Sequence, residues 1–480
     1  MPERLQRLVV LHTNDIHSHF EQMPKVAAFF DQVKGAVAPE LLLTVDIGDH
    51  MDRMRPETEG TSGRANIDIM NATGYEAFVL GNNEGLTFTS DVLEQVFREH
   101  AQFTVLGSNM LDAQTGQIPD WMVPYLILDK AGIRVGLIGV TAVYKEFYEL
   151  LGWQVTDPIE ATAYYAKLLR PQVDVLIVMS HLGLRMDERM ANELEGIDLI
   201  LGGHTHHLLE EPLLIGSTYL CGAGKFGRYV GHVEIEFDKA ERRIHGVNGR
   251  VVDLTDAKSS SSILMLLEAY KLLSHDALDI EVAKLALPLH LEWSEESQLG
   301  NLLAAGLRAW TGAEIGLVNA GQLLQGLKEG RVTRGRLLEI CPGPINPCRI
   351  RLSGINLLQA LEESLLSDFK EKVIYGFGFR GEVLGMLCLD GIQVTYDPAR
   401  APYTQIVEVT INGSPIELQR EYLIGTIDMF TFGAGYLSLS KGTSVEYLLP
   451  DFLRDVLAAQ LHNQAAIDQS IVLNKWIKRA

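Results

Sequence analysis

The sequence predicts an α/β (α+β) fold that is divided into two domains. Five short apolar runs, rich in β-branched residues and bounded by glycine or polar residues, are typical of buried strands. Segments with helical periodicity alternate with these runs, as they do in layered α/β domains. The length of 480 residues exceeds what one hydrophobic core usually organises, so we expect two domains and a linker.

The predicted elements follow one another in an order that favours two mixed sheets flanked by helices. The apolar runs are residues 8–11, 41–45, 77–80, 175–179 and 199–201. Helical periodicity covers residues 91–100 and 161–170, and turn signals indicate hairpins over 125–140 and 230–251. Antiparallel strands should therefore accompany the parallel ones.

A polar, serine-rich stretch separates the two predicted domains. Residues 255–262 are polar, and residues 263–273 have helical periodicity. The second domain opens with a helix over 298–310 and continues with strands such as 316–319 and 391–396. We therefore expect a first domain over 1–254, a linker with a helix over 255–290, and a second domain over 291–480.

The composition excludes several classes of function. Hydrophobic residues make up 47% and charged residues 21%, and no apolar stretch approaches the roughly 18 residues that span a bilayer. A formal net charge of −21 opposes binding to nucleic acid or acidic membranes, because such binding depends on basic surface. Four scattered cysteines predict no disulfide framework, and no secretory segment is evident. We expect a cytoplasmic protein, with its oligomeric state left open.

Each of the five apolar runs leads into residues that can bind a metal ion. Ligands in α/β sheets gather beyond the carboxyl ends of the strands, so residues far apart in sequence should converge there. The candidate ligands are Asp15, His17, Asp49, Asn82, His181, His204 and His206. Mixed carboxylate, imidazole and amide donors suit Zn, Mn or Fe(II) better than Mg or Ca.

Asp49 is the natural bridge between two metal ions. A bridging carboxylate keeps two cations roughly 3.5 to 4 Å apart, close enough to ionise a shared water and polarise a phosphoryl oxygen. Asp15, His17 and His206 would complete one metal site. Asn82, His181 and His204 would complete the other. Glu84 is expected to hold the loop that carries Asn82 and Asn83 by accepting hydrogen bonds from backbone amides.

These motifs, in this order, resemble the calcineurin-like metallophosphoesterases, and within them the two-domain 5′-nucleotidases. The matching stretches are Asp15-Ile16-His17, Gly48-Asp49, Gly81-Asn82, Ser180-His181 and Gly203-His204-Thr205-His206. The resemblance continues at 223–227 and resumes at 300–303, 319–321 and 394–398. It implies an N-terminal four-layer α/β/β/α metallophosphoesterase sandwich and a C-terminal α/β substrate domain. The ligand assignments that it implies agree with the grouping by donor chemistry.

The chain departs from this family at a catalytic position. Its members typically carry Gly-Asn-His-Glu, in which the histidine stabilises the transferring phosphoryl group or assists the leaving oxygen. This chain has Asn83 there. Losing a general acid can cost on the order of 10² to 10⁴ in rate, although Asn83 can still donate a hydrogen bond to a phosphoryl oxygen. Asn82 and Asn83 are therefore the candidate catalytic residues.

The second domain, which holds the substrate's base in this family, departs from the pattern at three positions. Leu324 replaces an arginine, Ala434 replaces an aspartate, and Met386 stands where an aromatic side chain often stacks on the base. We expect the substrate-binding residues to be Asn319, Gly321, Phe430 and Phe432. Together with Phe377 and Phe379, the two phenylalanines could form a stacking pocket, although core packing is the commoner role.

The sequence thus predicts a dinuclear-metal phosphohydrolase that resembles the 5′-nucleotidases. Its expected cofactors are two divalent metal ions (Zn, Mn or Fe), and its expected reaction is attack of metal-bound hydroxide on a small phosphoester, favouring a nucleotide. Two alternatives stay open. One is a phosphohydrolase for a cyclic nucleotide, a nucleoside diphosphate compound or a non-nucleotide. The other is a metal-binding sensor or scaffold with little turnover, suggested by Asn83.

Overall fold

The computed structural model describes residues 5–479 and divides the chain into two compact units. The first unit ends at Ser274 and the second begins at His275. This division falls inside helix α9 (Ser261–Leu278), within the predicted linker 255–290. Each unit has a hydrophobic core of its own.

The first unit is built on two six-stranded mixed sheets, with strand orders β14-β13-β1-β2-β3-β4 and β11-β12-β10-β9-β7-β6. The first sheet contains β1 (Leu5–Thr13), β2 (Leu42–Asp46), β3 (Ala77–Val79), β4 (Thr104–Leu106), β13 (Tyr229–Asp238) and β14 (Arg243–Asp253). The second contains β6 (Tyr125–Lys130), β7 (Ile133–Thr141), β9 (Val175–His181), β10 (Leu199–Gly202), β11 (Leu213–Ile215) and β12 (Thr218–Gly222). Parallel strands lie inside each sheet, and the predicted hairpins β6–β7 and β13–β14 are confirmed at the edges.

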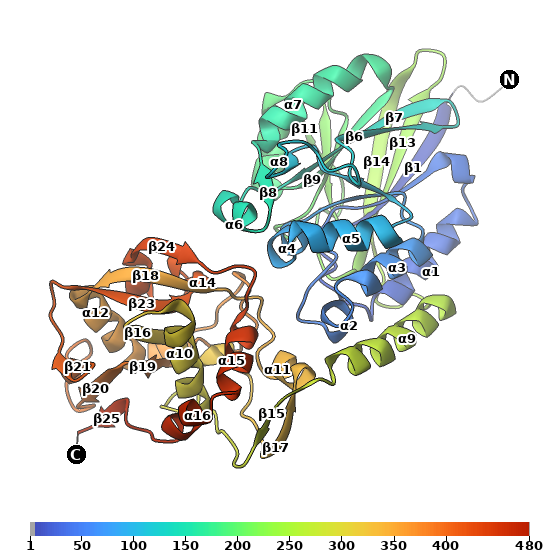
Figure 1. The fold of residues 1–480 in the computed structure, drawn as a ribbon. Helices are drawn as coiled ribbons and strands as arrows, with labels where there is room; N and C mark the ends of the chain where they lie inside the picture. Colours follow the sequence, from blue (N-terminus) through green and yellow to red (C-terminus); the bar gives the residue numbers. More distant parts are fainter. Residues whose placement is uncertain (1–4, 480) are drawn as a thin grey trace. The chain divides into compact units, whose positions relative to one another are not determined.

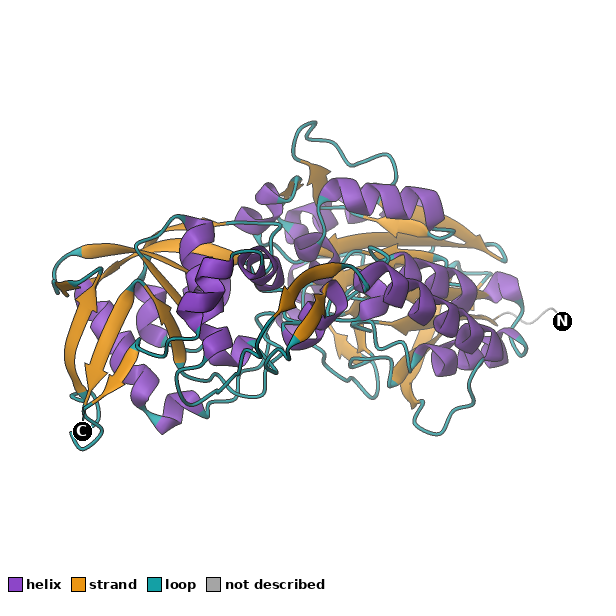
Figure 2. Cartoon of the chain, turned by 60° about the horizontal axis from the view of Figure 1, so that its bottom comes forward, coloured by secondary structure: helices purple, strands orange, loops and turns teal. Residues whose placement is uncertain are grey.

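The two sheets pack face to face between two layers of helices, as Figure 1 and Figure 2 show. Because successive side chains of a strand point to opposite faces of the sheet, β9 contributes side chains to two layers of the core. Val175, Ile177 and Met179 lie in the core between the sheets, which also contains Leu8 and Val10 of β1. Leu176 and Val178 instead pack with residues of the helical layer. The α/β/β/α sandwich is thereby confirmed.

Helices α1, α3 and α5 cover the outer face of the first sheet, and α7 and α8 cover that of the second (Figure 1). The helices of this unit are α1 (Met23–Lys34), α2 (Pro56–Glu59), α3 (Arg64–Thr73), α4 (Asn82–Thr87), α5 (Ser90–His100), α6 (Lys145–Leu150), α7 (Pro158–Leu169) and α8 (Leu184–Glu193). A short strand pair, β5 (Met110–Asp112) and β8 (Trp153–Val155), completes it.

The second unit combines a five-stranded sheet, a four-stranded sheet and a strand pair. Its strands are β15 (Glu281–Leu285), β16 (Ile315–Asn319), β17 (Gly330–Thr333), β18 (Pro347–Ser353), β19 (Leu387–Asp390), β20 (Ile392–Tyr396), β21 (Ile406–Ile411), β22 (Ser414–Pro415), β23 (Glu421–Ile427), β24 (Thr443–Tyr447) and β25 (Trp476–Lys478). Its helices are α10 (Gln298–Thr311), α11 (Arg334–Ile340), α12 (Gly354–Leu365), α13 (Ser367–Lys370), α14 (Asp428–Thr431), α15 (Leu453–Leu461) and α16 (Gln464–Ser470). The apolar face of α10 is buried in the core, with Leu299, Leu302, Leu303 and Leu307 shielded from solvent.

Two predictions from composition can be compared with this fold. Within residues 5–479, no helix combines the length and apolar character that a membrane crossing requires. The four cysteines, Cys221, Cys341, Cys348 and Cys388, are all free and buried.

Candidate metal centre

Polar residues at the carboxyl ends of five parallel strands meet at one edge of the sandwich. Asp15 and His17 follow β1, Asp49 follows β2, Asn82 opens α4 after β3, His181 ends β9, and His204 and His206 follow β10. Backbone hydrogen bonds hold the first two loops side by side. The Asp15 N–H donates to the Gly48 carbonyl at 2.9 Å, and the His17 N–H donates to the Asp49 carbonyl at 2.8 Å.

Three of these side chains form a first group, which consists of Asp15, His17 and His206. One ligand atom from each lies within 4.8 Å of the other two. His206 Nε2 is 3.5 Å from Asp15 Oδ1, and His17 Nε2 is 3.8 Å from the same oxygen. The two imidazole nitrogens are 3.2 Å apart. The group is therefore a compact set of two nitrogen donors and one oxygen donor.

A second group consists of Asp49, His181 and His204, again with ligand atoms within 4.8 Å of one another. His181 Nε2 lies 3.3 Å from Asp49 Oδ1. Asn82 adds an amide oxygen, which is 2.7 Å from His204 Nδ1 and 3.2 Å from His181 Nε2. This group thus offers two nitrogen donors and two oxygen donors.

The carboxylate of Asp49 joins the two groups. Its Oδ1 faces His181 of the second group at 3.3 Å, while its Oδ2 lies 3.8 Å from His17 Nε2 of the first. The backbone N–H of Asn83 donates to Oδ1 at 2.7 Å and fixes the orientation of the carboxylate. One residue therefore presents a different oxygen to each group, which is the geometry of a bridging ligand.

The donor set fits two divalent cations. Two carboxylates and four imidazoles converge in two groups whose ligand atoms lie within 4.8 Å of one another, and one amide oxygen joins the second group. Mixed nitrogen and oxygen donors of this kind suit Zn²⁺, Mn²⁺ and Fe²⁺.

The backbone around the two groups is strained. Five of the seven candidate ligands have positive φ angles, although none is a glycine: Asp15 (52°), His17 (47°), Asp49 (52°), His204 (73°) and His206 (59°). Side chains disfavour this left-handed region, and such residues cost about 1–3 kcal/mol each and cluster at functional sites. The loops thus adopt conformations that place ligands rather than conformations that their residues prefer.

Burial and charge shift the pKa values of these groups in opposite directions. Burial alone would raise the pKa of Asp49, but the nearby His181 and His17 hold it well below its usual value. Burial would lower the pKa of His181, but Asp49 raises it to about 10. Burial, with a contribution from Asp49, raises the pKa of Asp15 to about 7. Burial and neighbouring histidines lower the pKa of His204 and His206 to about 4. The last two imidazoles are therefore neutral at pH 7, which is the form that binds metal.

Polar residues behind the groups hold the loops in place. The carboxylate of Glu84 accepts from the backbone N–H groups of Gly81, Asp49 and Met51 at 2.9, 3.0 and 2.8 Å, which confirms its predicted role. Asn14 donates to Asp15 Oδ2 at 2.7 Å. The side-chain amide nitrogen of Asn83 lies 2.9 Å from His17 Nδ1, beside the first group.

One residue near the centre gave no signal in the sequence. Tyr144 follows the end of β7, and its hydroxyl lies 3.3 Å from His204 Nε2. A single tyrosine three residues beyond a strand cannot be recognised from the sequence as part of a metal centre.

The structure separates the predicted substrate-binding residues into buried and exposed ones. Asn319 and Gly321 are buried, and the Asn319 amide donates to the Leu384 carbonyl at 2.6 Å. Phe430, like Phe379 and Met386, lies in the core of the second unit. Phe432 is 45% exposed and stacks on the 52% exposed Phe377, with ring centroids 6.2 Å apart. Of the four predicted substrate-binding residues, Phe432 is therefore the one with an exposed aromatic ring, and it stacks on Phe377.

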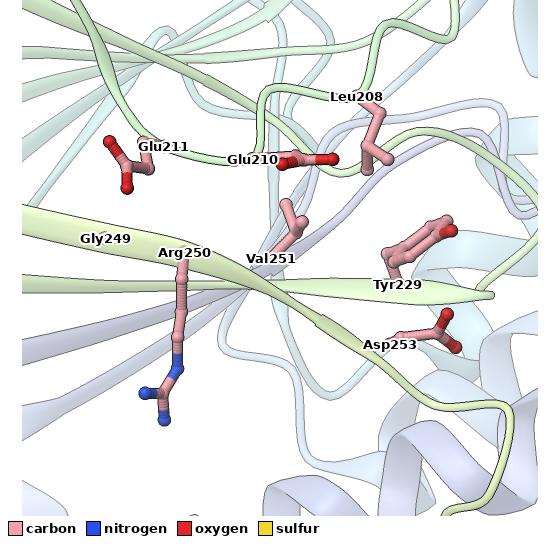
Figure 3. Close-up of a pocket in the computed structure, with 8 residues that line it drawn as sticks. All are labelled: Leu208, Glu210, Glu211, Tyr229, Gly249, Arg250, Val251 and Asp253. Atoms are coloured by element: carbon pink, nitrogen blue, oxygen red, sulfur yellow. The ribbon is translucent and has the colours of Figure 1, made fainter.

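A separate open pocket lies where the loop after His206 passes strands β13 and β14 (Figure 3). It is lined by Leu208, Glu210, Glu211, Tyr229, Gly249, Arg250, Val251 and Asp253. Figure 3 shows Arg250 extending away from Glu210 and Glu211. None of the seven candidate ligands lines this pocket, so it is distinct from the two metal-binding groups.

Comparisons with known proteins agree with this architecture. Residues 8–208 match the calcineurin-like phosphoesterase family, and residues 280–439 match the 5′-nucleotidase C-terminal domain. An uncharacterized metallophosphoesterase of Bacillus subtilis, YunD, is 37% identical over 460 residues, which cover 95% of this chain and 99% of that protein. The human 5′-nucleotidase is 25% identical over 474 residues, which cover 84% of this chain and 78% of that protein.

Solved structures show the same fold. The crystal structure of a putative 5′-nucleotidase from Staphylococcus aureus in complex with α-ketoglutarate has a TM-score of 0.70 and 16% identity, covering 99% of this chain and 100% of that one. Calcineurin-like phosphoesterases use a dinuclear centre of divalent metal ions. The chain belongs to the two-domain 5′-nucleotidase family of the calcineurin-like metallophosphoesterases, and it is a metal-dependent phosphoric ester hydrolase.

Proposed function

We propose that this chain releases phosphate from nucleotides at the centre joined by Asp49. The observation that carries the proposal is the position of the Asp49 carboxylate, whose two oxygens face two separate donor groups. A carboxylate in that position can hold two cations at the separation used in phosphoester hydrolysis.

Each metal ion has a defined set of residues in this proposal. Asp15, His17, His206 and Asp49 would hold one ion, and Asp49, Asn82, His181 and His204 would hold the other. The ions are Zn²⁺, Mn²⁺ or Fe²⁺, since these accept mixed nitrogen and oxygen ligands. When bound, a pair of such ions lowers the pKa of water and polarises a phosphoryl oxygen.

The protein's own groups orient the centre and the phosphoryl group. The Asn83 backbone N–H fixes the Asp49 carboxylate, and its side-chain amide lies at the first group, where it can donate to a phosphoryl oxygen. The ring of Phe226 lies 5.9 Å from that of His17 and 6.4 Å from that of His206, and forms an apolar wall beside the first group.

The exposed Phe377–Phe432 pair supports a nucleotide over a non-aromatic phosphoester. Aromatic rings favour offset stacking on other aromatic rings, and a nucleobase offers a flat aromatic face. Phe377 is 52% exposed and Phe432 is 45% exposed, so part of each ring is accessible for this contact. The family's hydrolytic relatives favour turnover over the sensor hypothesis.

The test is an assay of the purified protein with Mn²⁺ and with Zn²⁺ against nucleoside monophosphates, cyclic nucleotides, dinucleotide pyrophosphates and an aryl phosphate. Asp49→Asn should lower kcat/KM by at least about 10³-fold, because loss of the bridging charge disturbs both metal sites. The matched control is Asp276→Asn, whose carboxylate is 88% exposed. Equal activity of Asp49→Asn and wild type would refute the assigned centre, and metal binding without any turnover would favour the sensor.

A further inference from the structure

His204 faces the metal centre through a different ring nitrogen from the other three histidines. His17, His181 and His206 point Nε2 toward the carboxylates. His204 instead points Nδ1 toward the Asn82 amide oxygen, at 2.7 Å. A metal bound by Nδ1 requires a lone pair on that atom, so the proton of the neutral ring must be on Nε2.

In a metal-binding histidine, the ring nitrogen that points away from the metal carries the proton and needs a hydrogen-bond acceptor. For His181, the outward Nδ1 lies 2.7 Å from the Ile47 carbonyl, a backbone acceptor. For His204, the outward Nε2 lies 3.3 Å from the Tyr144 hydroxyl. Hydrogen bonds of this kind fix the tautomer and the ring orientation of a metal-binding histidine.

The position of Tyr144 follows from the sheet. The Ala142 N–H donates to the His181 carbonyl at 3.0 Å, which continues the pairing of β7 with β9 one residue beyond the end of β7. Tyr144 comes two residues later and precedes α6, with 37% of its surface exposed. Its ring centroid is 6.2 Å from that of His204, so the side chain borders the second donor group.

The hydroxyl of Tyr144 is able to accept the proton of His204. A phenol donates one hydrogen bond and can accept two. Its ordinary pKa is about 10, so the hydroxyl keeps its own proton at neutral pH and meets the ring nitrogen through an oxygen lone pair.

We propose that Tyr144 is a positioning residue of the second metal site. Its oxygen accepts from His204 Nε2–H and thereby keeps Nδ1 free for the metal. This inference rests on the function proposed above.

Tyr144→Phe tests the inference because it removes the hydroxyl and keeps the ring. Mn²⁺ is titrated calorimetrically into the metal-free protein. We expect one of two Mn²⁺ sites to weaken by roughly 10- to 100-fold, the range for losing such a partner. The melting temperature of the metal-free protein should stay unchanged, which separates positioning from a general structural role.

The control variant is Tyr164→Phe, which removes the hydroxyl of a 66% exposed residue on α7 and should leave the Mn²⁺ titration unchanged. Wild-type Mn²⁺ affinity in Tyr144→Phe would overturn the positioning role. Equal losses in both variants would also overturn the inference. Failure of the wild-type protein to bind two Mn²⁺ ions would instead refute the proposed centre, so the two failures are distinguishable.

Discussion

The backbone of Gly81 lies so close to Asp49 that no side chain fits between them. It precedes Asn82, and a Cβ atom built on it would lie 2.2 Å from Asp49 Oδ1 and 2.3 Å from the Asp49 nitrogen. Its φ of −87° is available to any residue, so the constraint is space alone. We predict that Gly81→Ala displaces Asp49 and lowers both kcat/KM and Mn²⁺ affinity by at least about 100-fold, since a misplacement of 1 Å can cost that much.

The matched control for this prediction is Gly246→Ala. A Cβ at that position would meet only the flexible carboxylate of Glu236, at 3.9 Å. Steady-state kinetics and calorimetry on both variants check the prediction. If Gly81→Ala retained wild-type kinetics, the approach of the two loops would be looser than the structure describes.

At the scale of single residues, the sequence predicted the convergence of the candidate ligands better than the environment of each one. The seven candidate ligands converge because each follows a strand, and that much is visible as an apolar run before a polar residue. The positive φ angles of residues such as Asp15 and His204 are not visible, because backbone strain is imposed by neighbouring loops. Nor could the sequence separate Phe430, in the core, from Phe432, at the surface, since both lie in one apolar stretch.

Among the helices, α7 offers the clearest test of local stabilisation. The side chain of its N-cap residue, Asp157, accepts from the backbone N–H groups of Ile159 and Glu160 at 2.8 and 3.0 Å. These donors have no partner within the helix. We predict that Asp157→Ala lowers the free energy of unfolding by about 1 kcal/mol, within the usual range of roughly 0.5–2 kcal/mol for such caps. Denaturant unfolding measures the change.

Thr89→Ala is the control for that cap. Thr89 is the N-cap residue of α5 but makes no side-chain capping bond. The variant should therefore lose less stability than Asp157→Ala, and neither should alter Mn²⁺ affinity. A larger loss for Thr89→Ala would contradict the assignment of the cap.

At the scale of elements, the sequence predicted strands and hairpins well where periodicity and turn residues agree. The hairpin of β6 and β7 surrounds the turn at Ala131 and Gly132, and both residues adopt positive φ angles there. Helix α4 was not predicted. Asn82 was expected in a loop but begins a helix whose first turn is held by Glu84, a tertiary arrangement that a six-residue stretch does not signal.

For the molecule as a whole, the predicted domain limits and the limits of the compact units differ across helix α9. The predicted first domain ends at residue 254, whereas the first compact unit ends at Ser274. The difference is the first part of α9, where Ile263, Leu267 and Tyr270 are buried and the Tyr270 hydroxyl donates to Asp68. Helical periodicity was visible in the sequence, but the surface against which the helix packs was not. The cytoplasmic location stays a prediction.

The last prediction concerns the independence of the first unit. All seven candidate ligands lie in residues 5–274, and both cores of the sandwich are built from the same residues. We predict that the chain 1–274 folds, binds two Mn²⁺ ions, and hydrolyses an aryl phosphate within about tenfold of the full-length rate, because a leaving group of low pKa needs little help from elsewhere. It should lose the preference for nucleotides, since Phe377 and Phe432 lie in the second unit.

The chain 1–254 is the informative comparison, because it lacks the buried part of α9. Removing Ile263, Leu267 and Tyr270 exposes the surface that they cover, and each such side chain stabilises a fold by about 1.5–3 kcal/mol when fully buried. The shorter chain should therefore melt at a lower temperature than 1–274. If 1–274 folded but bound no Mn²⁺, the centre would need a residue of the second unit, and the ligand set drawn from the first unit alone would be incomplete.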